Sequence, residues 1–228
     1  MQSLKPFSTV LATLFFVACA TRAQVPAPQP AGLVASLNGT VKVARSKVSM
    51  TLQFRDNIVS HDRITTELGS HANILLTRKA WLIIHELSVL TITDGLERIV
   101  IELDKGKIDY LLPRDFLRPG EVHKIRTPNA IVHVRGTIVQ VRGTVVVVRT
   151  EQSADGMKDS YVTQVDVPVG SALVGSVASP LMEHELGPGQ RVTIKGNILG
   201  PIQGIPFPPP RWQLPGGSFD LGQGDGGL

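Results

Sequence analysis

Cysteine is nearly absent from this chain, whose 228 residues include only Cys19. A fold held together by disulfide bonds is therefore excluded, and so is a metal site built from several thiolates. Cys19 itself falls within the apolar segment near the amino terminus. Cleavage of that segment would leave a chain without any cysteine nucleophile.

Aromatic side chains are also few, at 5% of residues, and the net charge is only +4. Nucleic-acid-binding proteins of this size usually carry a dense basic face with aromatic side chains for base stacking. The basic residues here are scattered along the chain, often close to acidic ones. The composition therefore predicts no nucleic-acid partner.

The common catalytic and metal-binding motifs are missing as well. Two H-E-x-x-H patterns begin, at His85 and His184, but Val89 and Pro188 stand at their closing positions. No G-x-S-x-G nucleophile elbow occurs in the sequence. We therefore expect no catalytic residue, no metal ion and no cofactor.

Residues 1–23 have the features of a secretory signal, with Lys5 followed by an apolar run and then by small residues. The pattern predicts cleavage after Ala23 and a periplasmic or secreted mature chain. An alternative is that Phe16–Cys19 forms a lipoprotein box, in which case Cys19 would carry a lipid anchor in the outer membrane.

The remaining chain divides into three parts by composition. Residues 24–32 are rich in proline and predict an extended linker, and residues 200–228 are dominated by proline and glycine. The latter stretch cannot bury enough apolar surface to offset its ordering entropy, so we expect a disordered tail. Residues 33–199 are long enough for one substantial domain, and no later apolar run is long enough for a transmembrane helix.

Short runs of alternating apolar residues recur throughout residues 33–199. They are separated by turn signals, among them Asn38-Gly39, which favours a hairpin, and Asp94-Gly95. No segment shows a convincing helical stripe. Regularly spaced short strands predict an all-β fold, either a sandwich or a short solenoid-like arrangement.

The stretch Arg126–Thr150 is saturated with valine and isoleucine, which favour strands. The unit V-R-G-T occurs in it twice, and the apolar positions change from even to odd across Gly136. Because side chains alternate between the two faces of a strand, a glycine at such a change indicates a bulge or corner. We expect a bent pair of central strands here.

Two segments of the sequence resemble the signatures of the FecR family of bacterial periplasmic domains. The first is T-P-N-A-I-V-H-V-R-G-T-I-V-Q-V, from Thr127 to Val141, and the second is D-R-I-T-T-E-L-G-S-H-A-N-I-L-L, from Asp62 to Leu76. The resemblance covers about residues 33–196, with Ile138 where the family has an aromatic residue and His61 where it has glycine. The residues that carry the resemblance, to which we assign structural roles, are Asp62, Arg63, Ser70, Thr127, Pro128, Arg135, Gly136 and Thr137.

The resemblance implies a non-enzymatic module for protein binding or signal reception at the cell envelope. The founding type of this family also has a membrane helix and a cytoplasmic regulatory part, for which this sequence has no matching segment. The expected partner is therefore an envelope protein, recognised by strand addition or by docking onto a face of the domain. The alternative is a structural or glycan-associated envelope domain without a signalling role.

Overall fold

The computed structural model describes residues 29–95, 97–113, 120–135, 143–152 and 161–205, together with the dipeptides 213–214 and 217–218. All regular secondary structure in these residues consists of β-strands, so the prediction of an all-β fold is confirmed. Within the same residues, no helix has the length and apolar character needed to span a membrane.

The strands form two layers that share the long strand β9 (Arg98–Pro113). Layer A runs, in order of hydrogen bonding, through β4 (Asn57–Val59), β1 (Pro30–Asn38), β6 (His71–Leu76), β7 (Trp81–Ile84), the second half of β9, β12 (Gly143–Gln152), β13 (Tyr161–Val169) and β16 (Gln190–Lys195). The short strands β17 (Ile198–Leu199) and β18 (Gln203–Gly204) both pair with β16.

Layer B has a matching order. It runs through β3 (Val48–Thr51), β2 (Val41–Arg45), β5 (Asp62–Thr66), β8 (Val89–Asp94), the first half of β9, β10 (Val122–Arg126), β11 (Ala130–Arg135), β14 (Ser171–Ser176) and β15 (Ser179–Leu186). The pair formed by β9 and β10 is parallel, and all the other described pairs are antiparallel. A small separate hairpin joins β19 (Gln213–Leu214) to β20 (Gly217–Ser218).

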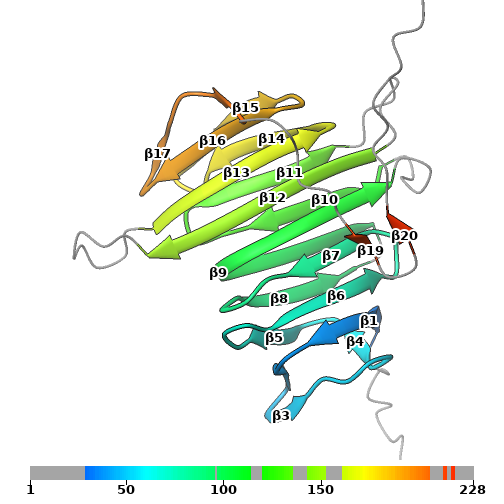
Figure 1. The fold of residues 1–228 in the computed structure, drawn as a ribbon. Coiled ribbons are helices and arrows are strands. Elements are labelled where there is room, and N and C mark those ends of the chain that lie inside the picture. Colours follow the sequence, from blue (N-terminus) through cyan, green and yellow to red (C-terminus); the bar gives the residue numbers. More distant parts are fainter. Residues whose placement is uncertain are drawn as a thin grey trace, which may run out of the picture.

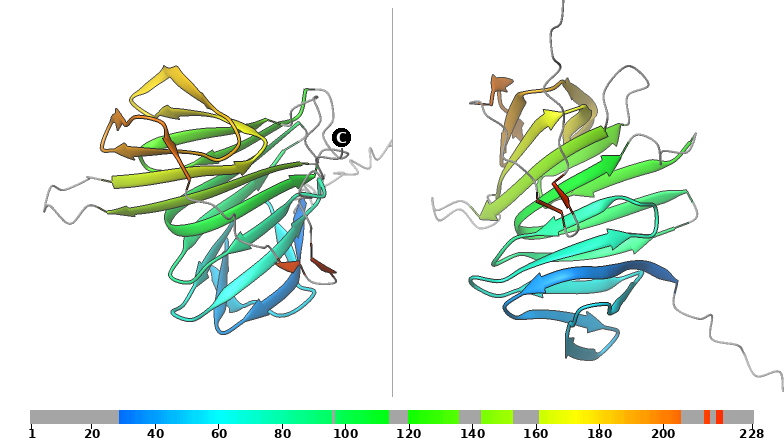
Figure 2. Two further views of the ribbon diagram at one scale, coloured as in Figure 1. Left: turned by 45° about the horizontal axis from the view of Figure 1, so that its top comes forward. Right: turned by 45° about the vertical axis from the view of Figure 1, so that its right-hand side comes forward.

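The chain alternates between the two layers as it passes from one end of the stack of strands to the other. A hairpin in one layer, such as β6–β7, is followed by a corner and then by a hairpin in the other layer, such as β8–β9. Figure 1 shows the resulting order, with the N-terminal strands at one end of the stack and β15 to β17 at the other. The two views in Figure 2 show the same succession. The architecture thus combines the two layers of a sandwich with the stepwise progress of a solenoid.

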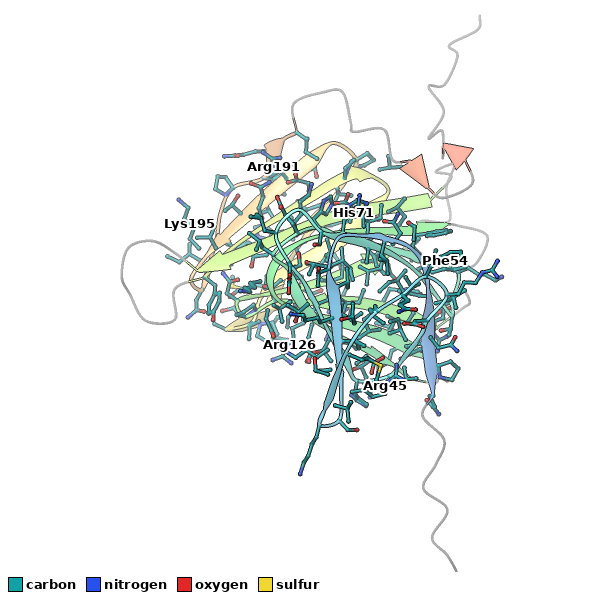
Figure 3. All side chains as sticks on the ribbon, turned by 60° about the horizontal axis from the view of Figure 1, so that its bottom comes forward. Arg45, Phe54, His71, Arg126, Arg191 and Lys195 are labelled. Atoms are coloured by element: carbon teal, nitrogen blue, oxygen red, sulfur yellow. The ribbon has the colours of Figure 1, made fainter. Side chains whose placement is uncertain are left out.

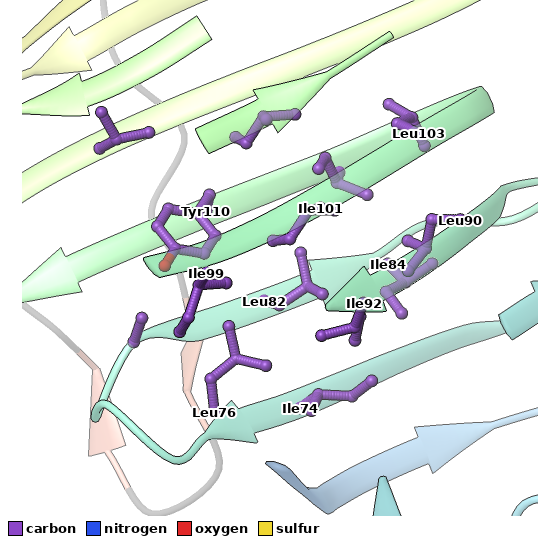
Figure 4. Close-up of a cluster of buried hydrophobic side chains, with 14 of the residues drawn as sticks. Ile74, Leu76, Leu82, Ile84, Leu90, Ile92, Ile99, Ile101, Leu103 and Tyr110 are labelled. Carbon is purple, nitrogen blue, oxygen red and sulfur yellow. The ribbon is translucent and has the colours of Figure 1, made fainter. Parts of the chain in front are cut away.

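One continuous hydrophobic core fills the space between the layers (Figure 4). Layer A contributes alternate residues such as Ile74, Leu82 and Ile84, and layer B contributes Leu90 and Ile101. All of these side chains are fully buried, and burial of each aliphatic side chain stabilises the fold by about 1.5–3 kcal/mol. The even positions Val132 and Val134 of β11 are also buried, as their alternation predicts.

Strand β9 passes from layer B to layer A at Gly106. The residues of β9 that belong to the hydrophobic core are odd before this glycine (Ile99, Ile101 and Leu103) and even after it (Ile108, Tyr110 and Leu112), while the buried Asp109 and Leu111 lie on the opposite face. Gly106 has a φ of 100°, and a Cβ at this position would overlap Ser88. The change in parity keeps both halves of the strand facing the same core, because the strand crosses from one side of that core to the other.

Two local expectations from the sequence differ from the structure. Asn38-Gly39 lies at a corner rather than in a hairpin, because β1 pairs with β4 and β6 in layer A, while β2 pairs with β3 and β5 in layer B. The strands β11 and β12 do not form a pair with one another. The first pairs with β10 and β14, and the second with β9 and β13.

The ordered strands also extend into segments that the composition predicts to be linker and tail. Strand β1 begins at Pro30, within the expected linker, and β18 lies within the expected tail. Hydrogen bonding to layer A explains both, because each of these segments adds to an existing strand edge.

We predict that Gly106→Ala destabilises the domain by about 2–4 kcal/mol, because the new methyl group meets Ser88 in a backbone conformation that already disfavours a side chain. Gly69→Ala is the matched control. Gly69 has a φ of 67° but no atom within 4 Å of the added Cβ, so only the conformational cost of about 1 kcal/mol applies. Urea unfolding of both variants measures the difference. Equal losses of stability would contradict the close-packed corner.

Candidate functional site

Asp62, the first residue of the resemblance, is buried and forms an ion pair with the partly exposed Arg45 near one end of the stack. Its carboxylate accepts hydrogen bonds from Arg45 Nε at 2.8 Å and from Arg45 Nη2 at 2.7 Å. The same carboxylate accepts the Val59 N–H at 2.9 Å, and Arg45 Nη2 also donates to the carbonyl of Asn57 at 2.9 Å. The hydrogen bonds that Arg45 donates to Asp62 raise the pKa of Arg45. This pair ties β2, β4 and β5 together, and thereby joins the two layers.

Arg63 does not contribute to this ion pair. Its Nη2 atom lies 2.6 Å from Asp104 Oδ2, and both side chains are about half exposed. A pair between Asp62 and Arg63, which their adjacency suggests, therefore does not form. An exposed ion pair of this kind contributes little to stability, in the range of about 0–1 kcal/mol.

Ser70 and its neighbours begin a row of buried polar side chains along the corners between the layers. Ser70 Oγ accepts the backbone N–H of Thr40 at 2.9 Å, where the chain turns from β1 into β2. Gly39, at a φ of 73°, lies so close to Ser70 that a side chain there would overlap it. The Ser70 position and the Gly39 corner therefore depend on one another.

The row continues at the next two corners. Thr66 Oγ1 donates to the carbonyl of His85 at 2.6 Å and accepts the N–H of Ser88 at 2.9 Å. Ser88 Oγ in turn accepts the N–H of Lys107 at 3.1 Å, next to Gly106. At each corner, some backbone N–H and C=O groups lose their partners in the strand ladders. The hydroxyl groups form hydrogen bonds with these groups, which must be satisfied because the backbone is buried.

The Thr127–Asn129 turn forms the last part of the row. Thr127 Oγ1 accepts the N–H of Ala130 at 2.9 Å and is 2.9 Å from the hydroxyl of Thr163 in layer A. Asn129 Nδ2 donates to the carbonyl oxygens of Tyr161 at 2.9 Å, Gly196 at 3.0 Å and Ile194 at 3.2 Å. We call the buried side chains that make these bonds the corner row, comprising Thr66, Ser70, Ser88, Thr127, Asn129 and Thr163.

The other motif residues occupy less central positions. Pro128 is exposed at the turn between β10 and β11. Strand β11 ends at Arg135, whose backbone pairs with Ser171 of β14. The side chain of Arg135 and the whole of Gly136 and Thr137 lie outside the described residues, so the expected bulge at Gly136 stays a prediction.

The sequence gives no local signal for a second buried polar group, which forms where β9 and β10 approach the β6–β7 turn. Arg78 Nη1 lies 3.0 Å from Glu121 Oε1, and Arg78 also contacts Asp94. His123 Nε2 lies 3.1 Å from the same Glu121 oxygen, without the alignment of a hydrogen bond, and its Nδ1 contacts the hydroxyl of Tyr110. We call these five residues the buried polar cluster.

Burial sets the protonation of the cluster. It lowers the pKa of His123, against the opposing effect of Glu121, and it raises the pKa of Tyr110 together with Glu121. Burial thus favours a neutral imidazole and a protonated phenol, and the histidine tautomer decides which of the two groups donates the hydrogen bond. Within the described residues, no group of three or more His, Cys, Asp or Glu side chains is arranged to hold a metal ion.

Comparison with known proteins does not assign this chain to a family. No family model and no curated protein matches the sequence. The chain is similar to two crystal structures of a candidate anti-sigma factor from Parabacteroides distasonis, each with 18% identity and a TM-score of 0.47. Each match covers 63% of this chain and 59% of the other, so the chain spans less than two thirds of that protein. The function must therefore be argued from this chain's own residues.

We predict that the free energy of unfolding falls as the pH is lowered through and below about 6.5, the ordinary pKa of histidine. The folded state holds His123 neutral, so the unfolded state binds more protons in this range, and stability present at higher pH is lost. One such group contributes a slope of up to about 1.4 kcal/mol per pH unit.

The variant His123→Gln should show a shallower dependence on pH than the wild type, as measured by urea unfolding between pH 7.5 and 5. The control is His184→Gln, which changes an exposed histidine and should leave the slope unaltered. An identical slope in the wild type and His123→Gln would show that the buried imidazole is not the source.

Proposed function

We propose that this chain is an exported FecR-like domain that binds a partner protein at the cell envelope and catalyses no reaction. The residues that carry the resemblance support this proposal through their roles in the structure. Asp62, Ser70 and Thr127 are committed to buried bonds that hold the two layers together. Because these side chains serve to hold the layers together, we expect the partner to bind to the exposed surface of the domain.

The observation that carries the proposal is a pair of exposed leucines on neighbouring corners. Leu68 is 75% exposed and Leu87 is 53% exposed. Their corners are held together by the N–H of Gly69, which donates to Glu86 Oε2 at 2.6 Å. We call Leu68 and Leu87 the corner patch.

One of the two residues of the corner patch is held in a costly backbone conformation. Leu87 has a φ of 55°, which costs a residue with a side chain about 1 kcal/mol or more. Strained residues are concentrated at binding sites, where the surrounding structure fixes them. Two exposed apolar side chains on neighbouring corners suit the surface of a folded protein better than a polar glycan.

The location of the partner follows from the sequence rather than from the fold. Residues 1–23 resemble a secretory signal, so the partner is expected outside the cytoplasm, as a protein of the envelope. A transporter, or a component of a receptor, is the kind of partner expected for a FecR-like domain.

Affinity capture from a solubilised envelope fraction tests the proposal. The wild-type chain should retain a partner protein in stoichiometric amount, and the double variant Leu68→Glu, Leu87→Glu should lose at least about nine tenths of it, because two charges would have to be buried against the partner. The control is Ile198→Glu, which places the same charge at a side chain that is also 75% exposed, on β17. It should retain the partner.

Two outcomes would contradict the proposal. Equal capture by the wild type and the double variant would exclude the corner patch as the binding surface. Retention of the wild type and of the double variant on purified cell-wall polymer, with no stoichiometric protein partner, would favour the glycan-associated role.

A further inference from the structure

Exposed apolar side chains are concentrated at the two ends of the stack of strands. Of the eleven large hydrophobic side chains that are exposed in the described residues, three lie at the β3 end and four at the β15–β18 end. The β3 end exposes Val48, Met50 and Phe54, and the opposite end exposes Leu181, Met182, Ile198 and Ile202. Leu181 is 98% exposed, Met182 71% and Val48 61%, although each lies in a strand. Stacked β-structures normally need polar ends to remain monomeric, and these ends instead combine charged residues with exposed apolar side chains.

Both ends of layer B present a strand with an open edge. Among the described strands, β3 pairs only with β2, and β15 pairs only with β14. Residues 183–186 of β15 follow a regular register, while residues 180–182 bulge out of the ladder and carry the exposed Leu181 and Met182. Open edges are templates for pairing with another chain, which applies to β3 and to the regular residues 183–186 of β15, whereas the bulge places Leu181 and Met182 beside that edge.

The directions of the two edge strands allow them to pair with each other. Between β3 and β15 the layer contains seven antiparallel steps and the one parallel step of β9 and β10. An odd number of reversals means that β3 and β15 run in opposite directions. When two copies are stacked in the same orientation, β15 of one copy therefore meets β3 of the next in an antiparallel arrangement. This is the pairing used by all but one of the described strand pairs.

The charges of the two ends are complementary. Residues 41–55, which form β2, β3 and the chain after them, contain four basic residues and no acidic residue: Lys42, Arg45, Lys47 and Arg55. Residues 179–189, which form β15 and the turn after it, contain Glu183 and Glu185 but no lysine or arginine. Glu183 lies 3.4 Å from His133 Nε2 of the same chain, and Glu185 is exposed. Lys42 and Arg45 are paired with Glu67 and Asp62, whereas Lys47 is exposed beside β3. Arg55 lies over the ring of Phe54 at the end that faces the viewer in Figure 3.

We propose that this protein associates with itself head to tail, with β15 of one copy adding to β3 of the next. The interface is heterologous, so it does not close on itself in a dimer, and it extends into short filaments as concentration rises. Only a few backbone hydrogen bonds can form between strands as short as β3, and Pro180 lacks an N–H. The association is accordingly weak and reversible, and is not required for capture of the envelope partner through the corner patch.

Two variants that each block one end provide the test. Val48→Glu places a negative charge on β3, and Leu181→Glu places one on β15. The wild type should form oligomers larger than dimers in sedimentation-velocity experiments as its concentration is raised to about 1 mM. Each variant alone should remain monomeric, with at least about tenfold weaker association, because its altered end must bury an unpaired charge.

An equimolar mixture of the two variants should form a dimer and nothing larger. The intact β15 of the Val48→Glu chain can pair with the intact β3 of the Leu181→Glu chain, whereas the two altered ends repel each other. Val122→Glu is the control, because it adds the same charge at an exposed side chain of β10, which lies between β9 and β11 rather than at either end of the layer, and it should assemble like the wild type. Circular dichroism of each variant verifies that it is folded.

Three outcomes would overturn the proposal. A variant that still dimerises alone would indicate that each end pairs with itself. A mixture that stays monomeric would show that the two ends do not recognise each other. A wild type that is monomeric up to about 1 mM would show that the ends do not serve self-association. Because these measurements use the purified chain alone, their failure would leave the capture experiment with the envelope partner unaffected.

Discussion

The fold depends on the hydrogen bonds made at the corners where the chain passes between its two layers. Each crossing interrupts the strand ladder and leaves backbone N–H and C=O groups that must be satisfied away from water. The hydroxyl groups of Thr66, Ser70 and Ser88 and the amide of Asn129 make these bonds. Glycine at Gly39 and Gly106 makes room for them, since the hydroxyls occupy the space that a Cβ would need. The aliphatic core can form only because these corners bring the two layers face to face.

This arrangement accounts for the motifs of the sequence in physical terms. Asp62, Ser70 and Thr127 are small polar or acidic residues that lie in the interior, where they would be costly if they were unpaired. Each is buried and hydrogen-bonded, and each connects segments that belong to different layers or different hairpins. Their chemistry is used in building the frame. The exposed corner patch and the open ends of the stack are then the surfaces on which recognition is proposed.

Local pattern was sufficient to predict the all-β class and many of the strands, because alternation of apolar residues is a local property. The structural roles assigned to Ser70 and Thr127 rested on the family resemblance rather than on local pattern, and in the structure both hydroxyls accept backbone N–H groups. Local pattern could not find the partner of Asp62, since Arg45 is 17 residues away in the sequence and reaches it only through the pairing of β2 with β5. The signal at Asn38-Gly39 was interpreted as a hairpin, because a glycine turn has the same sequence whether the next strand pairs or changes layer.

Long-range pairing also explains what was missed at β9 and in the buried polar cluster. The switch from odd to even core positions across Gly106 is visible in the sequence, but it was not recognised as a crossing within one strand. The cluster brings Arg78 of one turn to Glu121 and His123 beside β10, at separations of 43 residues or more in the chain. Asn129 was overlooked because its neighbours in the sequence do not indicate that it spans the two layers. The signal that could have found it is its place in a tight turn after Thr127-Pro128, between two buried strands.

Native-state hydrogen exchange of four backbone amides tests the central role of the corners most directly. The amides of Thr40, Ser88, Lys107 and Ala130 all donate to side-chain oxygens of the corner row. If the corner row holds the layers together, these amides should exchange only through global unfolding, with the same free energy as core amides such as that of Ile74. Exchange of these four amides as fast as that of the exposed turn between β2 and β3, while the core amides stay protected, would contradict this account.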